Sequence, residues 1–144
     1  REDRRIGYRI GEYISGRRFP VPPDRQFTVP LRQLQPSQLY ICEGKLRLVR
    51  EWMKLPEPDM DPIPVRELDG RLVMLDGHTR AVAAHLFGLE AVPVYRDTDA
   101  WDPGAYRENV RWCREAGVKS PAELAGRIVS YGDYEELWMK RCMG

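Results

Sequence analysis

The chain has 144 residues, of which 31% are charged and 42% hydrophobic, a composition typical of a soluble globular protein and unlike that of a disordered one. Its 23 basic and 22 acidic residues nearly balance, whereas a dedicated nucleic-acid binder usually has a basic excess. No apolar run approaches the roughly 18 residues that a membrane helix needs. The cysteines, Cys42, Cys113 and Cys142, are widely spaced, which argues against a disulfide framework or a zinc site and favours reduced thiols in a cytoplasmic protein.

Residues 1–24 form a basic segment that ends in Phe19-Pro20-Val21-Pro22-Pro23. Proline is excluded from helix interiors, so this stretch is expected to be an extended connector. Upstream, Ile6, Ile10 and Ile14 have the spacing of one helix face, which predicts a short helix. We therefore interpret residues 1–24 as an N-terminal arm with a proline-rich connector.

The next segment, residues 25–97, begins with a strand predicted at 27–29. An amphipathic helix is predicted over 44–54 from its apolar residues Leu46, Leu48, Val49, Trp52 and Met53. A loop rich in proline and acidic residues follows at 55–62. The next strand starts at residue 63, and Pro64 suggests that it is an edge strand or that the proline is its first residue.

Asp69-Gly70 is a two-residue hairpin signal, with the return strand at 71–75. A helix is predicted from Thr79 to Phe87, closed by Gly88, and a further strand at 91–95. The order hairpin, helix, strand predicts an α/β (α+β) domain over residues 25–97, in which helices pack on a small mixed sheet.

From residue 98 the pattern becomes helical. Pro103 suits a first helical turn, and Ser120-Pro121 opens another helix. We expect residues 98–144 to be a helical extension packed on the domain. Its buried contacts are predicted to come from Trp112, Leu124, Ile128, Leu137 and Trp138.

The junction Asp76-Gly77-His78-Thr79-Arg80 concentrates polar residues where a strand leads into a helix. The first amides of a helix lack backbone partners and attract phosphate, and glycine allows close approach. Thr79 and Arg80 offer a hydroxyl and a guanidinium for phosphate oxygens, while His78 offers a donor or a proton shuttle. Asp76 offers a ligand for Mg²⁺ or a proton acceptor.

Each residue also has a purely structural interpretation. Asp76 or Thr79 could cap the helix, Gly77 could serve only the turn, and Arg80 could pair with Glu67 or Asp69. Five such residues in succession are more than capping requires, so anion binding stands beside the structural interpretation. If an anion binds, we expect a pocket in front of residues 77–80, with residues 36–45 on its far side.

The block from Asp69-Gly70 through Asp76-Gly77-His78-Thr79-Arg80 to Gly88 resembles the central part of the ParB/sulfiredoxin superfamily. A strand, Gly-x-x-Arg, an alanine-rich helix and a closing glycine recur there in this order. Leu34-Gln35-Pro36-Ser37-Gln38 is similar to the opening of ParB-type domains. The resemblance covers about half of the chain and implies the fold of that superfamily.

Three branches of the superfamily differ at this turn. Partition proteins carry Gly-Glu-Arg-Arg and bind CTP; this chain has Thr79 in place of one of those arginines and no helix-turn-helix after it, so partition activity is not expected. The Asp-Gly-His-His-Arg of free-serine kinases is most similar to the present sequence. Sulfiredoxin carries a reactive cysteine where this chain has His78, so its chemistry is not expected here. The kinase branch has a glutamate base where this chain has Gln38, and Glu43 could substitute for it.

The resemblance and the turn together lead to a nucleotide- and phosphate-binding domain, with small-molecule phosphotransfer as its candidate activity. Phosphates would be held by Gly77, His78, Thr79, Arg80 and Gln38; the catalytic candidates are Asp76, His78 and Glu43. The implied cofactor is a nucleoside di- or triphosphate with Mg²⁺ on Asp76, acting on a small hydroxyl-bearing substrate. Two alternatives remain. One is a DNA-binding or DNA-nicking protein of a mobile element, supported by the basic arm. The other is a non-enzymatic interaction module, in which Trp101, Trp112 and Trp138 of the helical extension could form a partner groove.

Overall fold

The computed structural model describes residues 21–56 and 59–144. The expected helix containing Ile6, Ile10 and Ile14, and most of the expected arm, lie outside the described residues. No helix in the described part of the chain has the length and apolar character needed to cross a membrane.

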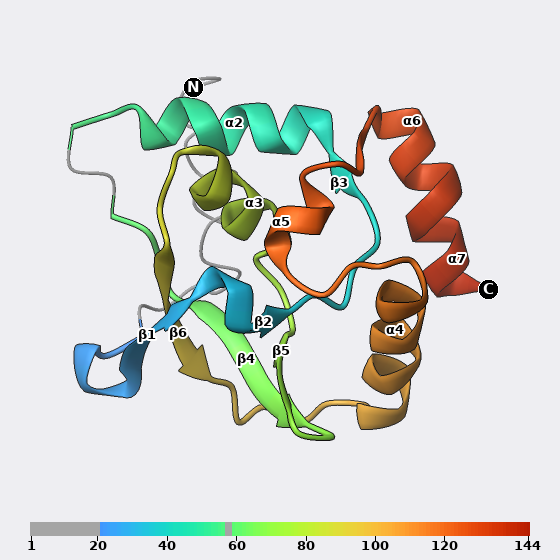
Figure 1. Ribbon diagram of the computed structural model, residues 1–144, viewed down its shortest axis with the longest axis horizontal. Helices are drawn as coiled ribbons and strands as arrows, with labels where there is room; N and C mark the ends of the chain where they lie inside the picture. The colour runs from blue at the N-terminus through green and yellow to red at the C-terminus, as the bar shows by residue number, and fades with distance from the viewer. Residues whose placement is uncertain (1–20, 57–58) are drawn as a thin grey trace.

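A five-stranded mixed sheet forms the centre of the fold (Figure 1). Two of its pairs, β1 with β6 and β4 with β5, are antiparallel, and the pairs β4 with β6 and β2 with β5 are parallel. The α+β class and the mixed sheet predicted from the sequence are confirmed. The strand order is β1 (Gln26–Pro30), β6 (Ala91–Arg96), β4 (Ile63–Leu68), β5 (Arg71–Met74) and β2 (Leu34–Gln35).

The remaining elements are helices, 3₁₀ turns and a small second sheet, in which β3 and β7 are parallel. The C-terminal helical segment runs through α6, a π-helical turn η3 and α7. The elements outside the five-stranded sheet are, in chain order, η1 (Pro23–Arg25), η2 (Leu31–Gln33), β3 (Ile41–Cys42), α2 (Glu43–Met53), α3 (His78–Leu86), α4 (Pro103–Glu115), α5 (Pro121–Leu124), β7 (Ile128–Val129), α6 (Tyr131–Tyr134), η3 (Glu135–Met139) and α7 (Lys140–Met143).

The hairpin between β4 and β5 turns at the predicted dipeptide. Asp69 has φ of 52° and Gly70 has φ of 79°, so both central residues are left-handed, as a type I′ turn requires. Asp and Gly tolerate this conformation better than other residues do. The turn sets the register, in which Leu68 lies opposite Arg71 and Val65 opposite Met74.

The prediction for Pro64 is wrong. It is the second residue of β4, which lies between β6 and β5 in the middle of the sheet. Pro64 pairs with Tyr95 of β6. The ladder between β4 and β5 begins only at Val65, and on that side Pro64 contributes its carbonyl alone, which accepts from the Leu75 N–H at 3.0 Å. A missing N–H is tolerated there because the neighbouring ladder has not yet started.

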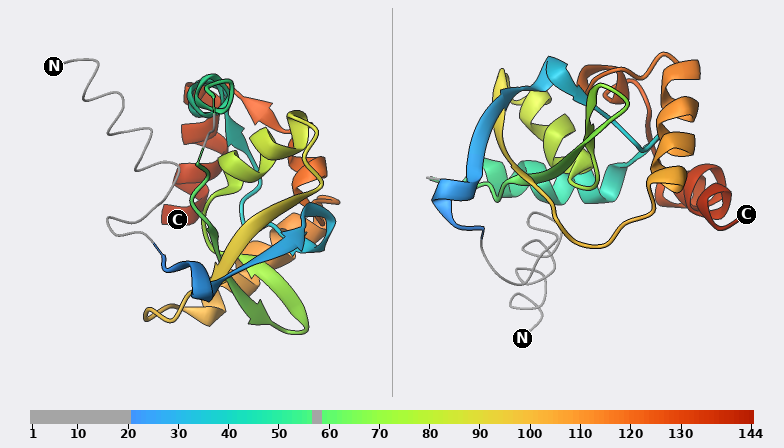
Figure 2. Two further views of the ribbon diagram at one scale, coloured as in Figure 1. Left: turned by 90° about the vertical axis from the view of Figure 1, so that its left-hand side faces the viewer. Right: turned by 90° about the horizontal axis from the view of Figure 1, so that it is seen from below.

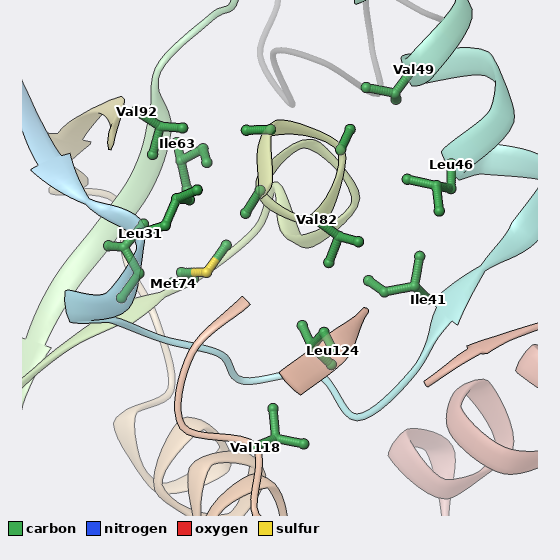
Figure 3. Close-up of a cluster of buried hydrophobic side chains, with 14 of the residues drawn as sticks. Leu31, Ile41, Leu46, Val49, Ile63, Met74, Val82, Val92, Val118 and Leu124 are labelled. Carbon is green, nitrogen blue, oxygen red and sulfur yellow. The ribbon is translucent and has the colours of Figure 1, made fainter. Parts of the chain in front are cut away.

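Helix α3 lies in the middle of the hydrophobic core. Residues 81–84 are all buried. Figure 3 shows the helix end-on, with Ile63, Met74 and Val92 of the sheet on one side and Leu46 and Val49 of α2 on the other. Small side chains on α3 let these surfaces approach closely, so the helix connects the sheet to α2.

The C-terminal segment shares this core. Leu124 is fully buried, and Trp138 forms an edge-on contact with Trp112 at a centroid distance of 6.1 Å. Leu137, by contrast, is 43% exposed, so its predicted burial is wrong; the helix turns its Trp138 side inward. In Figures 1 and 2, α4, α6 and α7 lie at the end of the molecule opposite β1.

Replacing Leu124 with Ala should lower the free energy of unfolding of the whole unit by about 2–5 kcal/mol, because it leaves a cavity in a shared core. The matched control is Leu137→Ala, which should change it by less than about 0.5 kcal/mol. Urea unfolding followed by far-UV circular dichroism and by tryptophan fluorescence measures both. Separate transitions for the two signals would contradict a common core.

Candidate functional site

The turn between β5 and α3 ends at Gly77, which has φ of 78° and ψ of 19°. The Gly77 N–H donates to Asp76 Oδ1 at 2.8 Å, and the Ala81 N–H donates to the Gly77 carbonyl at 3.0 Å. No side chain in the described part of the chain caps α3. The amides of residues 78–80 therefore precede the first bond within the helix, where the helix dipole gives partial positive charge.

The Arg80 side chain lies in the interior and is fully buried. Its Nη1 donates to the carbonyls of Asp61 at 2.7 Å and Pro62 at 3.3 Å. Its Nε and Nη2 have no hydrogen-bond partner among the described residues. A Cβ on Gly77 would come within 2.7 Å of Nη2, so only glycine leaves room for the guanidinium beside the turn.

Burial lowers the pKa of Arg80 to about 10, while Asp76 and Asp61 act in the opposite direction. The guanidinium remains charged at neutral pH. The alternative prediction, that Arg80 pairs with Glu67 or Asp69, is wrong. Glu67 forms an ion pair with Arg96, and Asp69 forms one with Arg107. A buried cation with two unpaired N–H groups is costly, and an anion placed at the turn would offset part of that cost.

His78 is also buried, and its role in the structure is to hold the segment that precedes β3. Its Nε2 accepts a hydrogen bond from the Ser37 N–H at 2.9 Å, so the proton of the neutral ring is on Nδ1. The Ser37 hydroxyl donates to the Met74 carbonyl at 2.6 Å. Burial lowers the pKa of His78 to about 4, which keeps the ring neutral. Smaller effects come from Asp76, which raises this pKa, and from Arg80, which lowers it.

Asp76 is exposed and borders a pocket of about 300 Å³. Three aromatic residues line it, Tyr95, Trp101 and Tyr106, and the ring centroids of Trp101 and Tyr106 are 5.5 Å apart. The Tyr106 hydroxyl donates to the Leu75 carbonyl at 3.3 Å, which connects α4 to the turn. Burial, Asp76 and Asp97 raise the pKa of Tyr106, in that order.

Arg66 forms another part of this wall. Its guanidinium stacks on Trp101 at 4.7 Å from the ring centroid and lies 3.7 Å from Asp97 Oδ1. Its Nε is buried without a hydrogen-bond partner among the described residues. The pocket thus combines a flat aromatic surface with charges of both signs.

The structure brings Asp76, Gly77, His78, Thr79 and Arg80 together at one turn, although His78 and Arg80 point inward. Gln38 donates to the Tyr40 carbonyl at 2.7 Å, and Glu43 is exposed at the start of α2, 3.4 Å from Arg47. Neither lines the pocket at Asp76. The pocket expected in front of residues 77–80, with residues 36–45 on its far side, is not the pocket at Asp76. None of those residues lines the pocket at Asp76, and its other walls come from β4, β6, the β6–α4 connection and α4.

Sequence reasoning did not find Asp61, Arg66 and Tyr106 as residues of this region. They come from a loop, from β4 and from α4 and carry no shared motif, so only the fold reveals that they meet. Among the described residues no group of three or more His, Cys, Asp or Glu could hold a metal ion. A Mg²⁺ ion at Asp76 would therefore need further ligands, such as phosphate oxygens.

No protein-family model and no curated protein matches this chain. Among solved structures, it is similar to the protein Atu1540 from Agrobacterium tumefaciens, with a TM-score of 0.45 and 18% identity. The match covers 67% of this chain and 50% of that protein. The chain therefore spans half the length of this neighbour, and the comparisons identify no family.

Two glycine substitutions should separate backbone strain from crowding at Arg80. Gly88 has φ of 91°, and a Cβ added there would meet nothing within 4 Å, whereas Gly77 has both a positive φ and Arg80 against it. Gly88→Ala should cost roughly 1–2 kcal/mol of stability. Gly77→Ala should cost about 1–3 kcal/mol more, because the guanidinium must shift. Equal losses in urea unfolding would contradict the close contact.

Titration of His78 should make stability depend on pH. The folded pKa, about 4, lies below the ordinary value of 6.5, so the unfolded state binds the proton more readily. The stabilisation is complete above pH 6.5 and is lost as the pH falls toward 4. Between pH 6.5 and about 5, wild type should lose about 2 kcal/mol more than His78→Gln, which keeps an acceptor for Ser37. The control His85→Gln, at an exposed position, should follow wild type; a His78→Gln variant that also follows it would contradict the assignment.

Proposed function

We propose that the chain binds the phosphate groups of a nucleotide at the N-terminus of α3. The observation that carries this proposal is the buried Arg80 guanidinium, which leaves Nε and Nη2 unpaired among the described residues, directly beneath an uncapped helix start. The amides of residues 78–80, the helix dipole and a fixed positive charge would act together on an anion at this position. A turn that served only to start a helix would not need a desolvated cation.

The pocket at Asp76 supports a nucleotide over a free phosphate ion. Its volume of about 300 Å³ suits part of a small organic ligand. The resemblance to the ParB/sulfiredoxin superfamily, closest at the turn to its free-serine-kinase branch, points the same way. Thr79 is half-exposed on the first turn of α3, and its hydroxyl would contact a phosphate oxygen.

Phosphotransfer to a small hydroxyl-bearing substrate is the activity that this arrangement would support. Asp76 would orient the acceptor hydroxyl or share a Mg²⁺ ion with the phosphates. His78 would act by positioning the turn, since its Nε2 already accepts from Ser37. Gln38 and Glu43 would take part only if residues 38–43 moved toward the turn when ligand binds.

The DNA hypothesis rests on the basic arm, which lies outside the described residues apart from its last four. The interaction-module hypothesis relied on tryptophans in the C-terminal segment, but Trp112 and Trp138 pack on each other and Trp138 is buried. Neither observation favours a second function over nucleotide binding.

Calorimetric titration of ATP, CTP and GTP, each with Mg²⁺, tests the proposal. Wild type should bind at least one of them. Arg80→Met should weaken that affinity at least about tenfold, equivalent to about 1.4 kcal/mol, because it removes the buried positive charge behind the turn. Arg80→Lys, which retains the charge without the fork, should fall between the two.

The matched control is Arg50→Met, since Arg50 is exposed on α2 and does not border the pocket at Asp76; its affinity should equal that of wild type. Circular dichroism establishes that each variant is folded. Thr79→Ala gives a second measurement outside the core, with an expected loss of several-fold. A wild type that binds no nucleotide, or folded Arg80 variants that bind as tightly as wild type, would contradict the proposal.

A further inference from the structure

A second cleft, of about 410 Å³, lies between the β4–β5 hairpin and α4. Figure 1 shows these two elements side by side, and the Arg107 Nε bonds to Asp69 Oδ2 across them at 2.9 Å. It shares no residue with the pocket at Asp76. Its lining includes four arginines, Arg71, Arg107, Arg111 and Arg114, and the apolar residues Leu68 and Val110.

Positive charge dominates this cleft, which has four arginines against two carboxylates. Arg107 and Arg111 are matched, by Asp69 and by Glu108 and Glu115. Arg114 donates to the neutral Gln35 Oε1 at 2.9 Å, so its charge is held in place without a carboxylate. The Arg71 side chain is exposed and makes no hydrogen bond or ion pair with a described residue.

The floor of the cleft is apolar. Leu68 and Val110 are each 7% exposed and pack with Val73 in a small cluster of their own. Positions 107, 111 and 114 follow helical spacing, so these arginines lie along one face of α4. The cleft therefore offers an apolar strip between unmatched cations.

We infer that this cleft binds an acidic peptide segment of a partner protein, independently of nucleotide binding. An apolar side chain of the peptide rests on Leu68 and Val110, and flanking carboxylates pair with Arg71 and Arg114. A nucleic-acid backbone would satisfy the arginines but would gain nothing from the apolar floor, and the chain lacks the overall basic excess of nucleic-acid binders.

The probe is a short fluorescein-labelled peptide of alternating glutamate and leucine, titrated with the whole chain and followed by fluorescence anisotropy. Arg71→Glu should weaken binding at least about tenfold, since it reverses an unmatched charge on an exposed strand end. Arg50→Glu makes the same change in net charge on α2, outside the cleft, and should leave the affinity within about twofold of wild type.

A second peptide with serine in place of leucine tests the floor, and should bind at least about fivefold more weakly than the first. A labelled DNA duplex tests the rival ligand. The inference is overturned if no peptide binds, if Arg71→Glu and Arg50→Glu weaken binding equally, if the serine peptide binds as well as the leucine peptide, or if DNA binds more tightly than the peptide and loses affinity in Arg71→Glu.

Discussion

Helix α3 is enclosed by the sheet, by α2 and by the C-terminal segment, and the small side chains of residues 81–84 allow all three to approach it. Each of these elements buries its apolar face by packing toward this helix. A larger side chain at any of the four positions would force one neighbour outward, with overpacking strain. The placement of α3 consequently fixes the distance between the sheet on one side and α2 and the C-terminal segment on the other.

The same enclosure determines the chemistry of the turn. Because the first turn of α3 is inside the protein, His78 and Arg80 project into the interior instead of into solvent. Each is held by backbone groups, His78 by the Ser37 N–H and Arg80 by the carbonyls of Asp61 and Pro62. The amides of residues 78–80 precede the first backbone bond of α3. Recognition of an anion would then combine direct contacts from the backbone with the field of a charge behind it.

Local patterns in the sequence predicted much of the fold. The hairpin at Asp69-Gly70, helices α2, α3 and α4, and strand β6 all follow from turn chemistry and periodicity within a few neighbouring residues. The position of Pro64 could not be predicted, since it depends on where a separate ladder begins. The depth of Arg80 was missed for a similar reason: residue type favours the surface for arginine, and only the packing of distant segments buries it.

The pocket at Asp76 shows most clearly what could not be predicted from the sequence. Its walls come from β4, β6 and α4, whose residues are far apart in the sequence. Nothing near Arg66 or Tyr106 marks either residue as part of a site. The junction at residues 76–80 was recognisable because its polar residues are consecutive, whereas the surroundings that give them their properties are assembled only in the folded chain.

The pairing of β1 has a consequence for synthesis of the protein. Its partner is β6, with Gln26 opposite Tyr95 and Pro30 opposite Ala91. During translation, β1 leaves the ribosome long before β6 exists, while the hairpin of β4 and β5 can form as soon as it emerges. Until β6 is made, the backbone groups of β1 that will form this ladder have no partner in the sheet. The nascent chain thus passes through an interval in which an unpaired strand is open to chaperones and to other chains.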